Sequence, residues 1–289
     1  MTKILILGVS GMLGSAAYRL FARSEGWQVV GAARSLVSLD QLPRSPNARL
    51  VGEFNIHDRD RIIQLLGAEK PDLVLNCIGV IKQLALAKDP LASIEINALF
   101  PHRLAQYCAL SKARLIQIST DCVFNGKGHM YRETDFADAE DLYGRTKYLG
   151  EVDYPNAVTL RTSIIGHEIG KTLSLVDWFL SQRGPLVKGY THAIYTGLPT
   201  MELARVVRDV VAPRPDLHGL WQVASAPIDK FSLLSLIAKA YGKGVTVIPD
   251  DSVRIDRSLD GSRFERETGY KVPDWPALVT AMHASRPCS

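Results

Sequence analysis

Residues 3–21 read KILILGVSGMLGSAAYRLF. The apolar run Ile4–Leu7 predicts a buried strand, and a helix-like stretch follows the last of three glycines. Glycines allow a sharp turn, and they let the backbone N–H groups at a helix N-terminus approach a pyrophosphate, whose charge the helix dipole favours. This GxxGxxG pattern follows the first strand of a β-α-β alternation, so it predicts a dinucleotide-binding turn. The turn comprises Gly8, Ser10, Gly11, Met12, Leu13 and Gly14.

Apolar runs separated by helix-like stretches recur along the first half of the chain. They are Ile4–Leu7, Gln28–Ala33, Leu73–Asn76, Leu115–Ile118 and Val158–Leu160. Their hydrophobicity is continuous rather than alternating, which indicates strands covered by helices on both faces. We therefore expect an α/β fold, a Rossmann-type doubly wound parallel sheet with a smaller C-terminal α/β substrate lobe.

The regular alternation ends near Ser163. Beyond it we expect further helices and strands, over Leu173–Gln182, Met201–Val211, Leu220–Val223, Lys230–Tyr241 and Val245–Ile248. We predict an NADP(H)-binding domain over residues 1–163, with returning segments from roughly 190–225, and a mainly substrate-binding lobe over 164–289.

Composition narrows the class of ligand and the compartment. The 289 residues include 34 basic and 30 acidic side chains without a run of like charge, which disfavours nucleic acid as the main ligand. Cys77, Cys108, Cys122 and Cys288 have no paired spacing, so we expect no disulfide framework, no metal site and a reducing cytoplasm. The N-terminal apolar run is too short to span a membrane.

Residues after the other strands are candidates for holding the cofactor. The second strand ends in Arg34 and lacks the acidic residue that binds an adenosine ribose hydroxyl, so NADPH or NADP is favoured over NADH. The alternative is that Arg34 faces solvent. We place Asn55 and Ile56 near the adenine and Cys77, Ile78 and Gly79 near the middle of the cofactor, although a structural strand-end role is equally open.

Tyr143 and Lys147 stand four residues apart on a predicted helix, so they project from one face. A nearby cation can lower a phenol pKa, which makes the tyrosine a usable general acid or base. A surface helix also produces this spacing by chance. Thr120, however, lies at the carboxyl end of a predicted strand, where doubly wound sheets bind ligands. Thr120, Tyr143 and Lys147 together form a predicted hydride-transfer site.

Several segments carry a family resemblance. Residues 119–126, STDCVFNG, resemble STDYVFDG, and residues 143–151, YGRTKYLGE, resemble YGRTKLAGE. Residues 160–163, LRTS, and the C-terminal Leu259-Asp260 and Pro273-Asp274-Trp275 are also similar. The chain resembles the extended short-chain dehydrogenase/reductase family and, within it, the dTDP-4-dehydrorhamnose reductases, over nearly its whole length.

The resemblance implies NADPH-dependent reduction of the 4-keto group of a nucleotide-activated 6-deoxysugar in deoxysugar or polysaccharide biosynthesis. It implies that Tyr143 protonates the 4-keto oxygen, that Thr120 polarises it, and that Lys147 holds the nicotinamide ribose and lowers the tyrosine pKa. Asn97 would help to set the geometry. Similar proteins pair helices corresponding to Leu91–Leu110 and Tyr143–Val152 in a homodimer.

Cys122 leaves alternative functions open. The 4,6-dehydratases of the family resemble Thr-Asp-Glu at this strand end, and the missing carboxylate disfavours elimination. Epimerase/reductases that make GDP-fucose resemble a cysteine here, but their partner histidine has no clear counterpart, although His167 and His192 lie in the substrate half. The regulatory β subunit of methionine adenosyltransferase also resembles this chain, so a catalytically silent NADP-binding protein is a further alternative.

The sugar itself is left open, because the resemblance weakens between Ile164 and Pro199. An amino or acetamido sugar is as credible as rhamnose. We expect Thr120, Asp121 and Cys122 to contact the substrate. The diphosphate requires a cation from Arg183, Lys188, Arg254, Arg257 and Arg263, of which we name Lys188 and Arg257 first.

Overall fold

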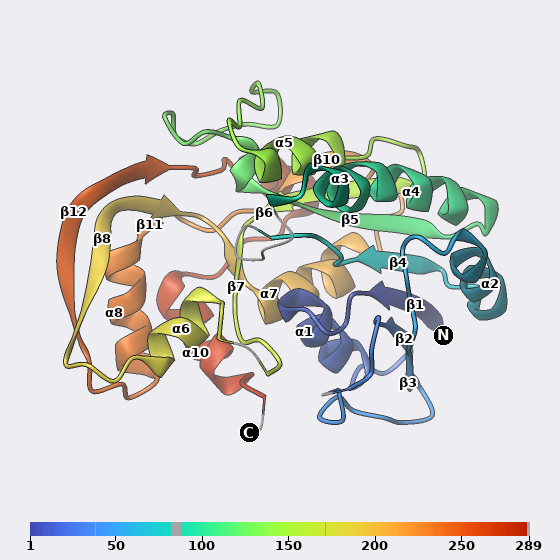
Figure 1. Ribbon diagram of the computed structural model, residues 1–289, viewed down its shortest axis with the longest axis horizontal. Helices are drawn as coiled ribbons and strands as arrows, with labels where there is room; N and C mark the ends of the chain where they lie inside the picture. The colour runs from blue at the N-terminus through green and yellow to red at the C-terminus, as the bar shows by residue number, and fades with distance from the viewer. Residues whose placement is uncertain (38, 82–87, 171, 288–289) are drawn as a thin grey trace.

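A computed structural model describes residues 1–37, 39–81, 88–170 and 172–287 (Figure 1). Its larger sheet has seven strands in the order β10-β6-β5-β4-β1-β2-β3, and every neighbouring pair is parallel. The strands are β1 (Thr2–Leu7), β2 (Trp27–Ala32), β3 (Ala48–Val51), β4 (Leu73–Asn76), β5 (Arg114–Thr120), β6 (Ala157–Thr162) and β10 (Gly219–Gln222). The predicted Rossmann-type fold is therefore confirmed.

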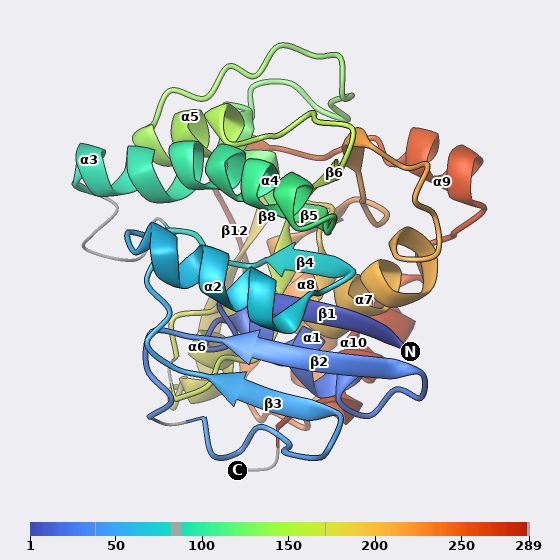
Figure 2. The same cartoon turned by 90° about the vertical axis from the view of Figure 1, so that its right-hand side faces the viewer.

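Helices cover both faces of this sheet, as its continuous hydrophobicity requires. Ile4 and Ile6 of β1 face one apolar cluster and Leu5 and Leu7 face the other. On the first face lie α1 (Met12–Phe21), α7 (Thr200–Arg205) and the π-helical segment η4 (Val206–Val211). On the second lie α2 (Arg59–Glu69), α4 (Phe100–Leu110) and α5 (Leu142–Leu149), as Figure 2 shows from the β3 edge.

The helix before β5 contains an irregular turn. It runs through α3 (Pro90–Ser93), the π-helical segment η2 (Ile94–Leu99) and α4 without a break. Such π turns widen a helix locally and are frequent at functional sites. Asn97 lies in this turn, and α5 packs against it. The turn therefore adjoins the helix that carries Tyr143 and Lys147.

A second body is built around a three-stranded sheet (Figure 1). Its central strand β8 (Leu186–Tyr195) pairs parallel with β12 (Thr246–Asp256) and antiparallel with β11 (Ile228–Asp229). Three helices pack against these strands, α6 (Leu175–Ser181), α8 (Lys230–Ala240) and α10 (Trp275–Ala284). The remaining short elements are η3 (Asp121–Val123), β7 (Ile164–Ile165), β9 (Leu198–Pro199) and α9 (Ser262–Thr268).

Two features of this second body differ from the sequence prediction. Strand β8 was not predicted, and β12 is 11 residues long where a strand was expected only over Val245–Ile248. Moreover, β10 joins the large sheet beside β6, so segments from both halves of the chain share one sheet. The predicted domain division at residue 163 stays a prediction.

In the described part of the chain, no helix has the length and apolar character needed to cross a membrane. Cys77, Cys108 and Cys122 are free thiols, and Cys288 lies outside the described residues.

Candidate active site

The glycine turn after β1 makes a close approach that only glycine permits. Gly8 has a φ of 86°, in the left-handed region, and a Cβ on Gly14 would overlap the Gly8 carbonyl oxygen. The N-cap of α1 is Gly11, which has no side chain to cover the first N–H groups of the helix. Gly8 also lies against the backbone of Cys77 and the side chain of Ile78. Two of the segments predicted to hold the cofactor are thus side by side.

A cavity of about 570 Å³ opens beside the ends of β2 and β3. Its polar lining consists of Arg34, Ser35, Glu53 and Arg61, so two guanidinium groups and a hydroxyl line this cavity together with one carboxylate. This set of donors suits a phosphate monoester. Arg61 was not predicted, because it lies within α2, where a charged residue is indistinguishable from a solvated helix face.

Asn55 follows β3, and its side-chain oxygen accepts a hydrogen bond from the His57 N–H at 3.1 Å. The structure leaves Ile56 partly buried, packed against the apolar cluster beneath α2.

The structure brings Thr120 and Tyr143 together. A hydrogen bond joins the Thr120 hydroxyl and the Tyr143 phenol, and Thr120 Oγ1 also donates to Asp121 Oδ1 at 3.1 Å. Helix α5 approaches β5 this closely because Gly144 has no Cβ, which would overlap the Cys122 carbonyl oxygen. The Asp141 side chain caps α5 by accepting a hydrogen bond from the Gly144 N–H at 2.8 Å.

The electrostatics of Tyr143 differ from the expectation. Burial raises the pKa of the phenol above its usual range, and the negative charges of Cys122, Asp121 and Asp141 raise it further. The hydrogen bond between Tyr143 and Thr120 opposes this shift. The prediction that Lys147 lowers the Tyr143 pKa is therefore wrong for this structure, because desolvation outweighs the other effects. A neutral phenol is a proton donor rather than a base.

Lys147 is buried and held by the strand beneath it. Its Nζ donates a hydrogen bond to the Ile118 carbonyl oxygen at 2.7 Å. Burial lowers the pKa of Lys147 to about 8, while the charge of Glu151 acts to raise it. Glu151 is itself bound by the buried Arg161, whose Nε donates at 2.8 Å to one carboxylate oxygen and Nη2 at 2.6 Å to the other. The ammonium therefore has a fixed position beside β5.

Asn97 connects two parts of the site. Its Nδ2 donates to the Val80 carbonyl oxygen at 3.0 Å and to Thr146 Oγ1 at 3.3 Å. Its Oδ1 accepts from the Val80 N–H at 2.9 Å. The side chain is 1% exposed. Asn97 thus ties the loop after β4 to helix α5.

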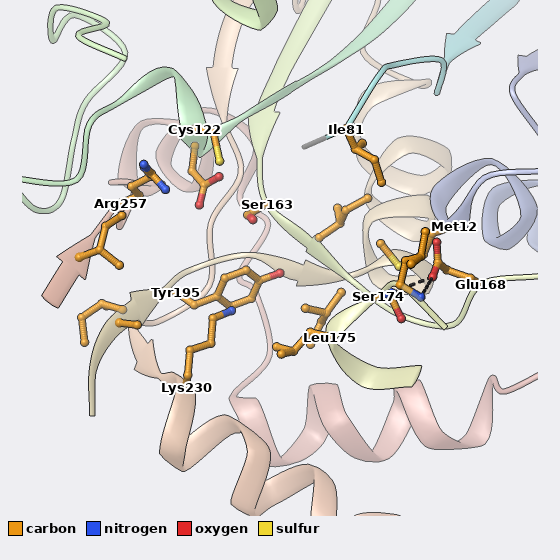
Figure 3. Close-up of a pocket in the computed structure, with 17 residues that line it drawn as sticks. Met12, Ile81, Cys122, Ser163, Glu168, Ser174, Leu175, Tyr195, Lys230 and Arg257 are labelled. Carbon is orange, nitrogen blue, oxygen red and sulfur yellow. Dashed lines mark hydrogen bonds between the residues drawn. The ribbon is translucent and has the colours of Figure 1, made fainter. Parts of the chain in front are cut away.

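A second cavity, of about 300 Å³, lies between the two bodies (Figure 3). Met12 of α1 forms part of its wall, as do Asp121 and Cys122 at the end of β5. Arg257, predicted to bind substrate, also lines it, and its Nε donates to the Phe124 carbonyl oxygen at 2.7 Å. Thr120 and Tyr143 stand behind this wall, linked to it through Asp121.

Lys188 does not join this cavity. It lies on β8 with its side chain 71% exposed, and its Nζ is 3.2 Å from Asp250 Oδ2 on β12. Strand alternation explains this placement, because Val187 and Gly189 are at inward-facing, buried positions and Lys188 faces outward. The structure thus separates Lys188 from the other predicted substrate residues.

Lys230 and Tyr195 were missed by the sequence reasoning. Both line the cavity, and the Lys230 ammonium lies 3.9 Å from the centroid of the Tyr195 ring. Lys230 stands 109 positions after Asp121 in the chain, and no local sequence pattern indicates that the two would converge. Asp121 is also buried, which raises its pKa, while the charges of Arg257 and Lys230 and its hydrogen bonds act to lower it.

His167 forms its hydrogen bonds with residues other than Cys122. Its Nδ1 lies 2.7 Å from Asp177 Oδ1 and its Nε2 lies 2.8 Å from the Tyr241 hydroxyl. It therefore holds the loop before α6 against α8 rather than pairing with Cys122. Among the residues that the structure describes, no cluster of histidine, cysteine and acidic side chains is suited to a metal ion.

Comparison with known proteins places the chain in a family. The RmlD substrate binding domain family matches residues 1–244. The probable low-salt glycan biosynthesis reductase Agl14 of Haloferax volcanii is 30% identical, with 97% of each chain covered. The β subunit of mouse methionine adenosyltransferase 2 is 29% identical, with 96% of this chain and 88% of that protein covered.

A solved structure shares the fold. The dTDP-4-dehydrorhamnose reductase of Bacillus anthracis, determined in complex with NADP, superimposes with a TM-score of 0.81 and 18% identity over 98% of this chain and 99% of that one. The resemblance to extended short-chain reductases, and to dTDP-4-dehydrorhamnose reductases among them, is confirmed. The chain belongs to the RmlD substrate binding domain family.

Proposed function

We propose that this protein is an NADPH-dependent reductase of the 4-keto group of a nucleotide-activated 6-deoxysugar, with the sugar hydroxylated or acetamido-substituted. One observation carries the proposal. Thr120 and Tyr143 are hydrogen-bonded at the carboxyl end of β5, and buried Lys147 lies one turn along the same helix. The glycine turn and the two-arginine cavity lie at the same edge of the sheet.

The residues of the chain fit the cofactor. The turn at Gly8 and Gly14 would admit the pyrophosphate, and Arg34 with Arg61 would bind the 2′-phosphate that distinguishes NADPH from NADH. When bound, NADPH supplies the hydride for the reduction. Residues 1–163 would provide this site, with Asn55, Ile56, Cys77, Ile78 and Gly79 along its edge, and residues 164–289 most of the substrate lobe.

Tyr143, Thr120 and Lys147 each have a separate role in the proposed reduction. Tyr143, kept neutral by burial, donates its proton to the 4-keto oxygen as negative charge develops there. Thr120 orients the phenol and polarises the same oxygen. Lys147, anchored on Ile118, orients the nicotinamide ribose and offsets the phenolate charge that remains on Tyr143. Asp121, Cys122 and Arg257 form the adjoining substrate wall.

A non-catalytic role is the second candidate, because the methionine adenosyltransferase β subunit matches almost the whole chain. In that case the protein would bind NADP and serve as a partner of another enzyme. Neither histidine in the substrate half supports the epimerase alternative, since His167 is bonded to Asp177 and Tyr241, and His192 is exposed on β8 and does not line the cavity.

We also propose a homodimer through the helices that flank the site. Leu91 and Leu149 are 79% and 58% exposed, although both lie on packed helices, and Tyr148 is 43% exposed. Sedimentation should give twice the chain mass, and a Leu149→Glu variant should sediment as a monomer. A wild-type protein that is monomeric at micromolar concentration would refute this.

The proposed activity is tested by NADPH consumption with dTDP-, UDP- and GDP-4-keto-6-deoxyhexoses. At least one should be reduced, and Tyr143→Phe should keep NADPH affinity but lose about 10²–10⁴-fold in turnover, as expected for a general acid. Tight NADP binding without turnover on any of these sugars would favour the partner-protein role instead.

A further inference from the structure

Lys230 is held at a fixed position on the lobe side of the cavity. It is the first residue of α8, whose N-cap Asp229 accepts hydrogen bonds from the Ser232 N–H at 2.8 Å and the Ser232 hydroxyl at 2.7 Å. The carboxylate of Asp229, which is adjacent to Lys230 in the sequence, is therefore hydrogen-bonded to Ser232. From the start of α8 the lysine side chain extends past the Tyr195 ring into the cavity (Figure 3).

The ammonium has no oxygen partner of its own in the described residues, where no hydrogen bond from Nζ and no carboxylate within 4 Å is found. The ring of Tyr195 and the charges of Asp121 and Cys122 face it, and Arg257 lines the same cavity. Burial lowers the pKa of Lys230 to about 8, against the effect of those two negative groups. The ammonium therefore lines the cavity without an oxygen acceptor among the described residues, and its N–H groups are available to donate hydrogen bonds to a ligand there.

The position of Lys230 identifies the part of the ligand that it faces. Asp121 and Cys122 directly follow Thr120, the residue bonded to the reacting phenol. Met12, from the cofactor turn, lines the same cavity. A sugar whose ketone met Thr120 and Tyr143 would therefore extend past Asp121 and Cys122 into the cavity that Lys230 lines from the lobe.

We propose that Lys230 is a substrate-binding residue that donates hydrogen bonds to an oxygen substituent of the sugar near the ketone. The inference rests on the proposed function and deepens it by naming the sugar class. A hydroxyl, an acetamido carbonyl or a carboxylate provides the required acceptor. A free amino group, which is cationic at neutral pH, would be repelled by the ammonium, so sugars with a free amine are poor ligands.

The test measures binding, so that it does not depend on turnover. Calorimetry on the NADP-loaded protein compares dTDP, UDP and GDP with the same nucleotides carrying a 6-deoxyhexose. Lys230→Met should weaken binding of the nucleotide sugar about tenfold or more, as for loss of a charge-assisted hydrogen bond, and leave the affinity for the nucleoside diphosphate unchanged. Lys230→Gln, which keeps two N–H donors, should recover part of the loss.

Lys239→Met is the matched control, because Lys239 is an exposed residue on the same helix. It should bind both ligands like the wild type.

Sugar-nucleotide affinity should also fall as pH rises through about 8 in the wild type, but not in Lys230→Met. Equal sugar-nucleotide affinity in Lys230→Met and the wild type overturns the inference. An equal loss for the nucleoside diphosphate also overturns it, because the lysine would then bind phosphate. Lys230-dependent binding without any turnover would instead refute the reductase activity alone.

Discussion

The side-chain amide of Asn97 pairs with both backbone groups of Val80, accepting from its N–H at 2.9 Å and donating to its carbonyl at 3.0 Å. A third bond, to Thr146, connects this pair with the helix that carries Tyr143 and Lys147. Because Asn97 is buried within a π-helical turn, its amide can reach both the loop and the helix. We therefore propose that Asn97 is a positioning residue of the candidate site.

Asn97→Ala should lower both stability and turnover. The substitution leaves the Val80 N–H and carbonyl buried without partners, at a cost of about 1–3 kcal/mol for each unsatisfied group. Denaturant unfolding and kcat measure the two effects. Asn156→Ala is the control, because within the described residues its side chain donates one hydrogen bond, to the Ala105 carbonyl oxygen, away from the site. A normal kcat in Asn97→Ala would show that the loop does not depend on this residue.

Removing one member of the buried pair Glu151–Arg161 should destabilise the fold strongly. Arg161 is 1% exposed and makes a two-point contact with the carboxylate, so Glu151→Gln leaves a buried guanidinium without its counter-ion. The expected loss is about 3–5 kcal/mol in the free energy of unfolding. Breaking the exposed pair of Lys127 and Glu140 by Lys127→Ala should cost far less, because solvent screens both charges. Equal losses in the two variants would contradict this account.

Gly14→Ala should abolish cofactor binding, because the added methyl group would overlap the Gly8 carbonyl oxygen and open the turn. Gly67→Ala is the control. Gly67 lies in α2 with nothing within 4 Å of the added carbon, and alanine there should stabilise the protein by about 0.5–1 kcal/mol. Fluorescence titration with NADPH and thermal unfolding would measure both. Full NADPH affinity in Gly14→Ala would exclude the turn as the pyrophosphate site.

Arg34→Ala and Arg61→Ala should each weaken NADPH binding about tenfold or more while leaving NADH binding unchanged, since only NADPH carries the 2′-phosphate. Arg23→Ala, at an exposed arginine after α1, should change neither. The readout is the ratio of the two dissociation constants. If both cofactors lose affinity equally, the arginines contribute general charge and not phosphate recognition.

Lys147 should make the stability of the protein rise with pH in the alkaline range. Its folded pKa of about 8 lies below the value of about 10.4 expected when unfolded, so between these values the unfolded chain binds more protons. Stability therefore increases with pH there, relative to a Lys147→Met variant, in which this titration is absent. Urea unfolding of both proteins from pH 7 to pH 10 would measure the difference. A constant difference would mean that Lys147 is not desolvated.

The large sheet and the candidate site of Thr120, Tyr143 and Lys147 could be predicted because their signals are local. Buried parallel strands such as Leu73–Asn76 are continuously apolar, and the glycine turn and the Tyr143–Lys147 spacing each fall within a few residues. Strands β8 and β12 have charged and exposed positions along them, so no apolar run marks their length.

The other differences from the sequence prediction depend on how distant parts of the chain pack together. Lys230 and Asp121 line the same cavity although they are far apart in the sequence, and Lys188 faces outward because of strand register. The Tyr143 pKa was predicted from one neighbouring charge, but desolvation of the phenol depends on the whole site.

The most direct test of the central claim follows deuterium from NADPH into the product. The protein is incubated with NADPH deuterated at nicotinamide C4, using both stereochemical forms, and with the nucleotide-activated 4-keto-6-deoxyhexoses. With one form, the account predicts a single deuterium at C4 of the reduced sugar, detected by NMR, and about 10²–10⁴-fold slower incorporation in Tyr143→Phe. Bound NADPH that transfers no deuterium to any of these sugars would contradict the account.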